Sequence, residues 1–181
     1  MSLLIPLMNW IEKMADFSIF KQKYKQYEDT LKNTSYDKDN DEYLCSKENK
    51  VINFDTLSLK FNKEKGKKRV DALFEKNKEL FLVEFKNQKQ SDIKKEDISS
   101  KFKDSLNLLE RLFNELNLSF RDFEICLYLA MKDVKVYGYK RHCIGQEIEC
   151  RLQADENLKR FKNIKCAPKK SFLEEYEEIF K

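Results

Sequence analysis

Residues 68–88 read Lys68-Arg69-Val70-Asp71-Ala72-Leu73-Phe74-Glu75-Lys76, then Asn77-Lys78, then Glu79-Leu80-Phe81-Leu82-Val83-Glu84-Phe85-Lys86-Asn87-Gln88. Apolar and β-branched residues dominate the middle of both runs, which predicts two β-strands, 68–76 and 79–88. The two residues between them are long enough for a tight turn, and Asn is a residue that such turns favour. The segment therefore predicts an antiparallel β-hairpin.

The length of this turn fixes which residues of the two strands face each other. The predicted pairs are Val70 with Phe85, Ala72 with Val83, Phe74 with Phe81, Leu73 with Leu82, and Asp71 with Glu84. Apolar residues meet apolar residues, and one acid meets another. A slip of one residue would destroy both matches, because side chains alternate between the two faces of a strand.

The remaining periodicities predict helices and strands on both sides of this hairpin. Before the hairpin, a helix is predicted along Phe17, Phe20, Tyr24, Tyr27 and Leu31, with Asp16 as its N-cap, followed by a loop over 34–50 and a strand over 51–61. After the hairpin, a helix is predicted over 98–116, a strand over 123–131, and helices at about 146–161 and 171–180. Ser171 and Glu174 are placed as a capping box for the last helix. The order α-β-β-β-α-β predicts an α/β fold with a mixed central sheet flanked by helices.

We expect a single domain over residues 1–181, with a core at about 16–131 and a helical C-terminal extension at about 140–181. The net charge is only +4 although 38% of the residues are charged, so a nucleic-acid surface would have to come from local clusters of lysine. Five cysteines without a CxxC pair indicate reduced thiols and a cytoplasmic protein rather than a zinc site. Residues 1–11 are too short to cross a membrane and indicate a docking segment or the entry to a first helix.

The opposed acids are the strongest chemical signal in the sequence. Asp71 and Glu84 would repel each other and lose hydration, so a compensating cation is expected beside them. Carboxylate oxygens without a soft ligand nearby suit Mg²⁺ or Mn²⁺. Lys86 follows Glu84 by two residues and so lies on the same face, where Gln88 continues the row. These residues predict a metal site beside a phosphodiester.

Asp71 followed by Glu84-Phe85-Lys86 resembles the PD-(D/E)XK nuclease superfamily, the restriction-endonuclease-like proteins, and the element order over residues 16–131 resembles its core. The resemblance implies that Asp71, Glu84 and the carbonyl of Phe85 bind Mg²⁺, and that Asp71, Glu84 and Lys86 are catalytic. Val70 replaces the proline of the family motif. Many members add a glutamate from the first helix, for which Glu28 and then Glu48 are candidates, and Gln88 is a further candidate residue of the site. The Gln-x-x-x-Tyr signature of RecB-like members is absent after Lys86.

The function expected from this reading is a Mg²⁺-dependent endonuclease that hydrolyses nucleic acid, DNA in preference to RNA. Nucleic-acid contacts are expected from Lys65, Lys67, Lys68, Arg69 and Lys89. A homodimer is left open, and no membrane or nucleotide cofactor is expected. Two alternatives remain, namely a catalytically inert nucleic-acid-binding module of the same fold and a protein-protein interaction protein with an immunity or regulatory role.

Overall fold

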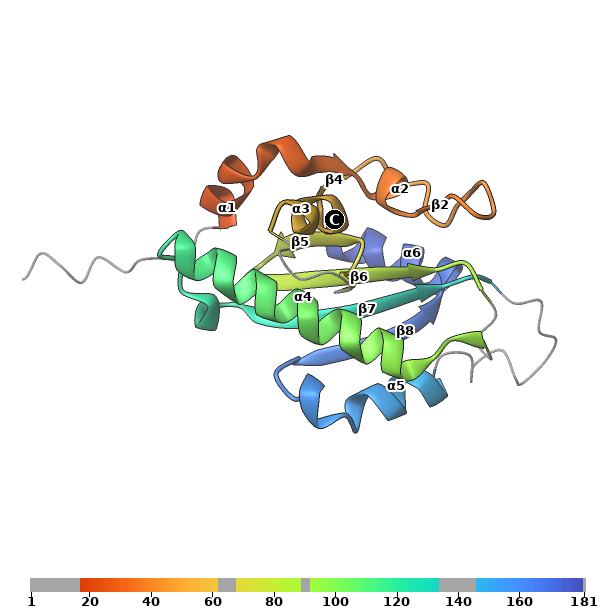
Figure 1. Ribbon diagram of the computed structural model, residues 1–181. Coiled ribbons are helices and arrows are strands. Elements are labelled where there is room, and N and C mark those ends of the chain that lie inside the picture. Colours follow the sequence, from red (N-terminus) through yellow and green to blue (C-terminus); the bar gives the residue numbers. More distant parts are fainter. Residues whose placement is uncertain (1–16, 62–67, 89–91, 134–145, 181) are drawn as a thin grey trace, which may run out of the picture.

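The computed structural model describes residues 17–61, 68–88, 92–133 and 146–180. These residues form a mixed α/β fold around a six-stranded sheet in the order β1-β4-β5-β6-β7-β8 (Figure 1). The strands are β1 (Glu28–Thr30), β4 (Lys50–Asn53), β5 (Ala72–Lys76), β6 (Glu79–Lys86), β7 (Glu124–Met131) and β8 (Asn163–Pro168). The pairs from β1 to β6 are antiparallel, and β6, β7 and β8 run parallel. The expected mixed sheet flanked by helices is confirmed.

Helices cover both faces of the sheet. They are α1 (Phe17–Lys23), α2 (Leu31–Thr34), α3 (Phe54–Phe61), α4 (Lys95–Glu115), α5 (Gln146–Gln153) and α6 (Lys169–Phe180). The long helix α4 crosses one face and α6 lies behind the other (Figure 1). A separate small hairpin pairs β2 (Tyr36–Asp37) with β3 (Glu42–Tyr43). No helix in the described part of the chain is both long and apolar enough to span a bilayer.

The hairpin of β5 and β6 has the predicted register within the two strands, but the predicted pairs of Asp71 with Glu84 and of Val70 with Phe85 are not part of its ladder, and Val70 and Phe85 pack in clusters on opposite faces of the sheet. Its pairs run from Ala72 opposite Val83 to Lys76 opposite Glu79. Asn77 and Lys78 both have positive φ, 54° and 64°, as a type I′ turn requires. The turn therefore fixes the alternation of the two strands, and this alternation places Asp71 beside the Glu84 segment.

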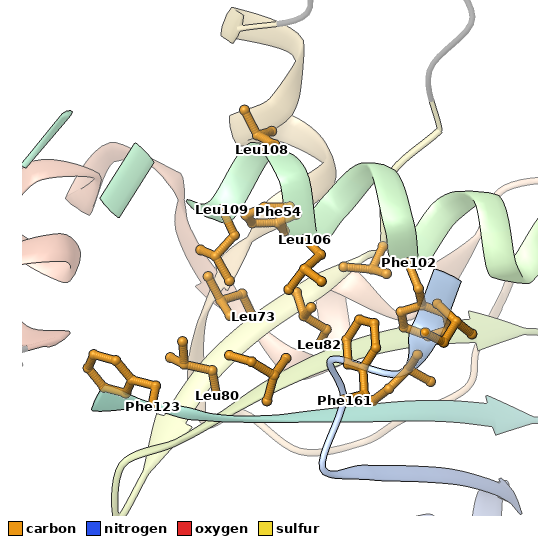
Figure 2. Packing of buried hydrophobic residues seen from close by; sticks show 14 of the residues in the cluster. Phe54, Leu73, Leu80, Leu82, Phe102, Leu106, Leu108, Leu109, Phe123 and Phe161 are labelled. Carbon is orange, nitrogen blue, oxygen red and sulfur yellow. The ribbon is translucent and has the colours of Figure 1, made fainter. Parts of the chain in front are cut away.

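The alternation separates two apolar clusters, one on each face. On the α4 side, Phe102, Leu106 and Leu109 lie over Leu73 and Leu82 (Figure 2). On the α6 side, the buried aromatic residues are Phe74, Phe81, Phe85, Tyr128, Phe172 and Tyr176. The predicted inward row of β7, namely Phe123, Ile125, Leu127, Leu129 and Met131, is confirmed in the α4-side cluster. Glu84 shares its face with Leu82, so it points toward α4.

Two predicted N-terminal elements differ from the structure. The helix expected to reach Leu31 ends at Lys23, and residues 28–30 instead form β1, which pairs with β4. Leu31 packs in the α6-side cluster, away from the α1 stripe. The strand expected over 51–61 ends at Asn53, whose side chain accepts a hydrogen bond from the N–H of Thr56 and so caps α3. The expected loop over 34–50 contains β2 and β3.

The expectation of a purely helical C-terminal extension is wrong. Residues 163–168 form β8, which pairs in parallel with β7 and extends the sheet. The expected helix at 146–161 ends at Gln153. The expected capping box is also wrong, because α6 starts at Lys169 and Ser171 already lies inside the helix. The predictions for Asp16, the docking segment 1–11 and residues 140–145 lie outside the described residues.

Candidate functional site

Asp71 lies immediately before β5 and is held there by three hydrogen bonds. Its backbone N–H donates to the carbonyl of Val83, and its own carbonyl accepts from the N–H of Phe54, both at 3.0 Å. Its side-chain Oδ2 accepts from the N–H of Phe85 at 2.6 Å. The carboxylate is therefore fixed against the backbone of the residue that separates Glu84 from Lys86.

Glu84 is completely buried and is surrounded by cations. Its Oε1 lies 3.0 Å from Nζ of Lys86 and 2.6 Å from Nζ of Lys101, which comes from α4. Its Oε2 is also buried and has no hydrogen-bond partner among the described residues. A buried carboxylate oxygen without a partner is costly, so this atom is available to a further cation or donor.

The electrostatics tie these residues into one cluster. Burial raises the pKa of Asp71 well above its ordinary value, and the negative charge of Glu84 raises it further. Burial lowers the pKa of Lys101, but the charges of Glu84 and Asp71 outweigh this effect, so the net pKa is raised. Lys101 therefore stays charged and compensates the two acids.

A pocket of about 540 Å³ opens beside this cluster. Asp71, Phe85, Lys86 and Gln88 line one side of it, so three of the four residues of the predicted shared face reach the pocket and Glu84 does not. The opposite wall is the β2–β3 hairpin with the residues before it, 34–40. Glu84 is not among the lining residues, so it lies beneath the surface behind Lys86. The pocket is polar and large enough to admit a phosphate group with its bound water.

The lining of the pocket is acidic. Its carboxylates are Asp37, Asp39, Asp55 and Asp71, and its ammonium groups are Lys38 and Lys86. An excess of negative charge in a concave site attracts cations and repels bare phosphate. Such a lining disfavours a bare phosphate and favours a phosphate that arrives together with a cation.

Sequence reasoning missed Lys101 and Asp55. Lys101 lies three residues after Ile98 and four before Ser105, both buried, so a lysine within the apolar stripe of α4 was a signal. Asp55 lies in the first turn of α3, where a strand was expected, and its charge helps to raise the pKa of Lys101. The Asn53 cap was the signal that would have placed Asp55 on a helix.

Glu28 and Glu48, the candidates for an additional acid, do not join the site. Glu28 lies on β1 and forms an ion pair with Lys50 at 3.1 Å. Glu48 is exposed and forms an ion pair with Lys32 at 2.9 Å. The expected placement of Glu28 failed because the first helix ends before it.

Only two of the five basic residues expected to contact nucleic acid, Lys68 and Arg69, lie in the described part of the chain. Lys68 is exposed and pairs with Asp97 at 3.5 Å. Arg69 does not lie on an exposed rim, because its side chain is only 7% exposed and pairs with Asp104 at 3.3 Å. Lys65, Lys67 and Lys89 lie outside the described residues.

The residues of the cluster offer oxygen donors of the type that Mg²⁺ binds. No group of three or more His, Cys, Asp or Glu side chains that could hold a metal occurs within the described ranges. Mg²⁺ commonly uses only one or two carboxylates and keeps several waters. Asp71, the partnerless Oε2 of Glu84 and the Phe85 carbonyl are hard oxygen ligands of this kind.

Comparisons with known proteins give no relative for this arrangement. No protein-family model matches the chain, and no curated protein or solved structure shows significant similarity to it.

Proposed function

We propose that this protein is a Mg²⁺- or Mn²⁺-dependent nuclease of the PD-(D/E)XK type that hydrolyses phosphodiester bonds, with DNA as the favoured substrate. One observation carries the proposal. Asp71 and Lys86 line a 540 Å³ pocket at the open end of a hairpin, and Glu84 is paired with Lys86 and buried behind it, with one carboxylate oxygen that has no partner among the described residues. Two carboxylates can hold a metal ion that activates a water, and a lysine beside them can orient that water or a phosphate oxygen.

In this proposal each residue has a separate task. Asp71, Glu84 and the Phe85 carbonyl would hold the ion, which supplies a Lewis acid and an acidified water when it is bound. Lys86 lines the pocket and can orient the attacking water or donate to a phosphate oxygen. The amide of Gln88 lines the same wall and can donate to the phosphate.

The topology supports the same proposal. β4, β5 and β6 are antiparallel neighbours, α4 follows, and β7 pairs in parallel with β6. This order agrees in part with the α-β-β-β-α-β order that the resemblance implies, although α3 lies between β4 and β5 and further short elements precede β4. Asp71 lies just before the second of these strands and Glu84 lies on the third, close to the positions that the resemblance implies.

The experiment combines isothermal titration of Mg²⁺ and Mn²⁺ with plasmid cleavage on the same samples. Asp71→Asn should lose metal binding and cleavage together, while Lys86→Met should keep metal binding and lose cleavage. Lys38→Met is the matched control, because Lys38 lines the same pocket on the hairpin wall and is exposed. Cleavage at the wild-type rate by purified Asp71→Asn or Lys86→Met would refute the proposal.

A second candidate is a catalytically inert nucleic-acid-binding module of the same fold. It is favoured by the two ammonium groups of Lys86 and Lys101, which already compensate Glu84 without a metal. Such a module would bind DNA equally well in EDTA and in Mg²⁺ and would produce no cleavage. The titration above separates the two candidates, because only the nuclease requires metal affinity that depends on Asp71.

A further inference from the structure

Two lysines from different elements share one oxygen of Glu84. Lys86 ends β6, lines the pocket and has a side chain that is 25% exposed. Lys101 projects from α4, is not among the residues that line the pocket, and has a side chain that is 17% exposed. The two cations therefore approach Glu84 from different sides, one from the pocket and one from the interior.

A completely buried carboxylate must keep a cationic partner, since an unpaired buried charge is strongly destabilising. If Lys86 were its only partner, Lys86 could not leave Glu84 to contact a substrate. Lys101 can remain in place, because its helix is 21 residues long and is anchored by the buried residues Ile98, Phe102 and Ser105 around it. Its contact with Glu84 is also the shorter of the two, 2.6 Å against 3.0 Å.

We propose that Lys101 is a positioning residue that holds and neutralises Glu84 from the interior, so that Lys86 can turn into the pocket and bind a phosphate oxygen of the substrate. This inference rests on the proposed nuclease function. It assigns a role to Lys101, a residue that is not part of the Asp-Glu-Lys motif. It has a second consequence. The Lys101 ammonium competes with a bound metal ion for the charge of Glu84, so it lowers metal affinity while it supports catalysis.

The test is Lys101→Met, which keeps the length of the side chain and removes its charge. Metal affinity measured by titration should rise several-fold, because one competing cation is gone. The kcat for cleavage should fall about 10- to 100-fold with a small change in KM, because Lys86 is then held by Glu84. Lys101→Arg, which keeps the charge, should restore most of kcat.

A rise in metal affinity together with a fall in kcat distinguishes a positioning role of Lys101 from a purely structural one. A residue needed only for folding would lower metal affinity, kcat and thermal stability together. Lys103→Met is the matched control, since Lys103 lies on the same helix but is exposed and contacts Asn157. It should leave metal affinity and kcat unchanged. If Lys101→Met does not fold by circular dichroism, Lys101→Gln should show the same pair of changes.

Failure of this inference can be distinguished from failure of the proposed function. If the wild type binds metal and cleaves DNA while the uncharged Lys101 variants match it, or lose affinity and kcat together, the role of Lys101 is overturned and the nuclease stands. If the wild type neither binds metal nor cleaves, both fall together.

Discussion

The Oδ2 atom of Asp71 accepts a 2.6 Å hydrogen bond from the backbone N–H of Phe85. This bond joins the residue just before β5 to the residue that separates Glu84 from Lys86. It fixes the acid in front of the pocket even though burial and the charge of Glu84 both oppose its ionisation. The ionised Asp71 carboxylate therefore lowers the stability of the folded state, as charged groups at functional sites often do.

Asp71→Asn should therefore stabilise the metal-free protein at pH 7 by about 1 kcal/mol, after allowance for partial exposure. Asn can still accept the Phe85 N–H bond, but it carries no charge. Because the folded-state pKa of Asp71 is raised, its ionisation costs stability above that pKa, and the cost disappears as pH falls below the ordinary value. Urea unfolding in EDTA at pH 7 and pH 4 measures the change.

The matched control is Asp39→Asn, because Asp39 is exposed on the hairpin wall of the same pocket. Its effect on the free energy of unfolding should be within about 0.5 kcal/mol. A loss of stability in Asp71→Asn at pH 7 would show that the ionised carboxylate stabilises the fold and that its pKa is not raised.

The hairpin could be predicted from the sequence because turn length, face alternation and acid pairing all agreed on one register. In residues 51–61 the sequence signals for strand and helix disagree. The buried residues Phe54, Leu57 and Ser58 fit a helical period, while the β-branched start at Val51 and Ile52 fits a strand, and the structure uses both. β8 was missed because its six residues at the sheet edge end in Pro168, which weakens a strand signal.

The candidate site was predictable only as far as it is local in sequence. Asp71, Glu84 and Lys86 lie close together in one hairpin segment, although Asp71 precedes β5 and contacts the Phe85 N–H and is not paired with Glu84 in the ladder. Lys101 reaches Glu84 only because α4 packs across the sheet, and the angle of that packing depends on tertiary contacts. Tertiary structure also decides which basic residues near the start of the hairpin are exposed, as Lys68 is, and which are buried, as Arg69 is.

Arg69→Ala should destabilise the fold rather than weaken contact with nucleic acid. The Arg69 guanidinium lies 3.3 Å from Asp104 and donates to the carbonyl of Lys68. Its removal leaves Asp104 without this cation in a largely buried place, which costs about 3 kcal/mol. Chemical denaturation measures the loss, and a cycle with Asp104→Asn isolates the pair. Wild-type stability combined with a smaller salt dependence of DNA binding would instead support the original surface role.

Lys78→Gly should stabilise the hairpin by about 0.5–1 kcal/mol. Lys78 has φ of 64°, a left-handed conformation that costs about 1 kcal/mol for a residue with a Cβ and little for glycine. The backbone bonds of Lys78, from its N–H to Glu75 and from Glu124 to its carbonyl, do not involve its side chain. Thermal unfolding checks the gain. Lys76→Gly, within β5, is the contrasting variant and should lower stability.

Leu82→Ala and Leu59→Ala form a pair that tests the placement of the core. Leu82 is completely buried under α4, whereas Leu59 on α3 is 68% exposed. Loss of the Leu82 side chain should cost about 2–5 kcal/mol through the cavity that it leaves. Loss of the Leu59 side chain should cost less than about 0.5 kcal/mol. Equal effects in urea unfolding would contradict the face assignment of β6 and α3.

Cys166 and Cys150 should differ sharply in their reaction with iodoacetamide. Burial, with a smaller effect from the charge of Glu149, raises the pKa of Cys166 to about 12, while Cys150 is exposed. At pH 8 the thiolate fraction of Cys166 is then on the order of 10⁻⁴, and the thiolate is the reactive form. Peptide mass spectrometry should find Cys150 modified and Cys166 intact, until urea exposes both.

The same shift predicts a loss of stability in alkali. An unfolded cysteine has a pKa of about 8.5, so between that value and 12 the unfolded chain releases a thiol proton that folded Cys166 retains. The folded state is therefore increasingly disfavoured as pH rises through this window, by up to about 1.4 kcal/mol per pH unit from this group. Cys166→Ala should flatten the decline in the free energy of unfolding between pH 9 and pH 11. An unchanged slope in that variant, or alkylation of native Cys166 as fast as Cys150, would show that the β8 edge opens to solvent and that the thiol is not held in the packed face of the sheet.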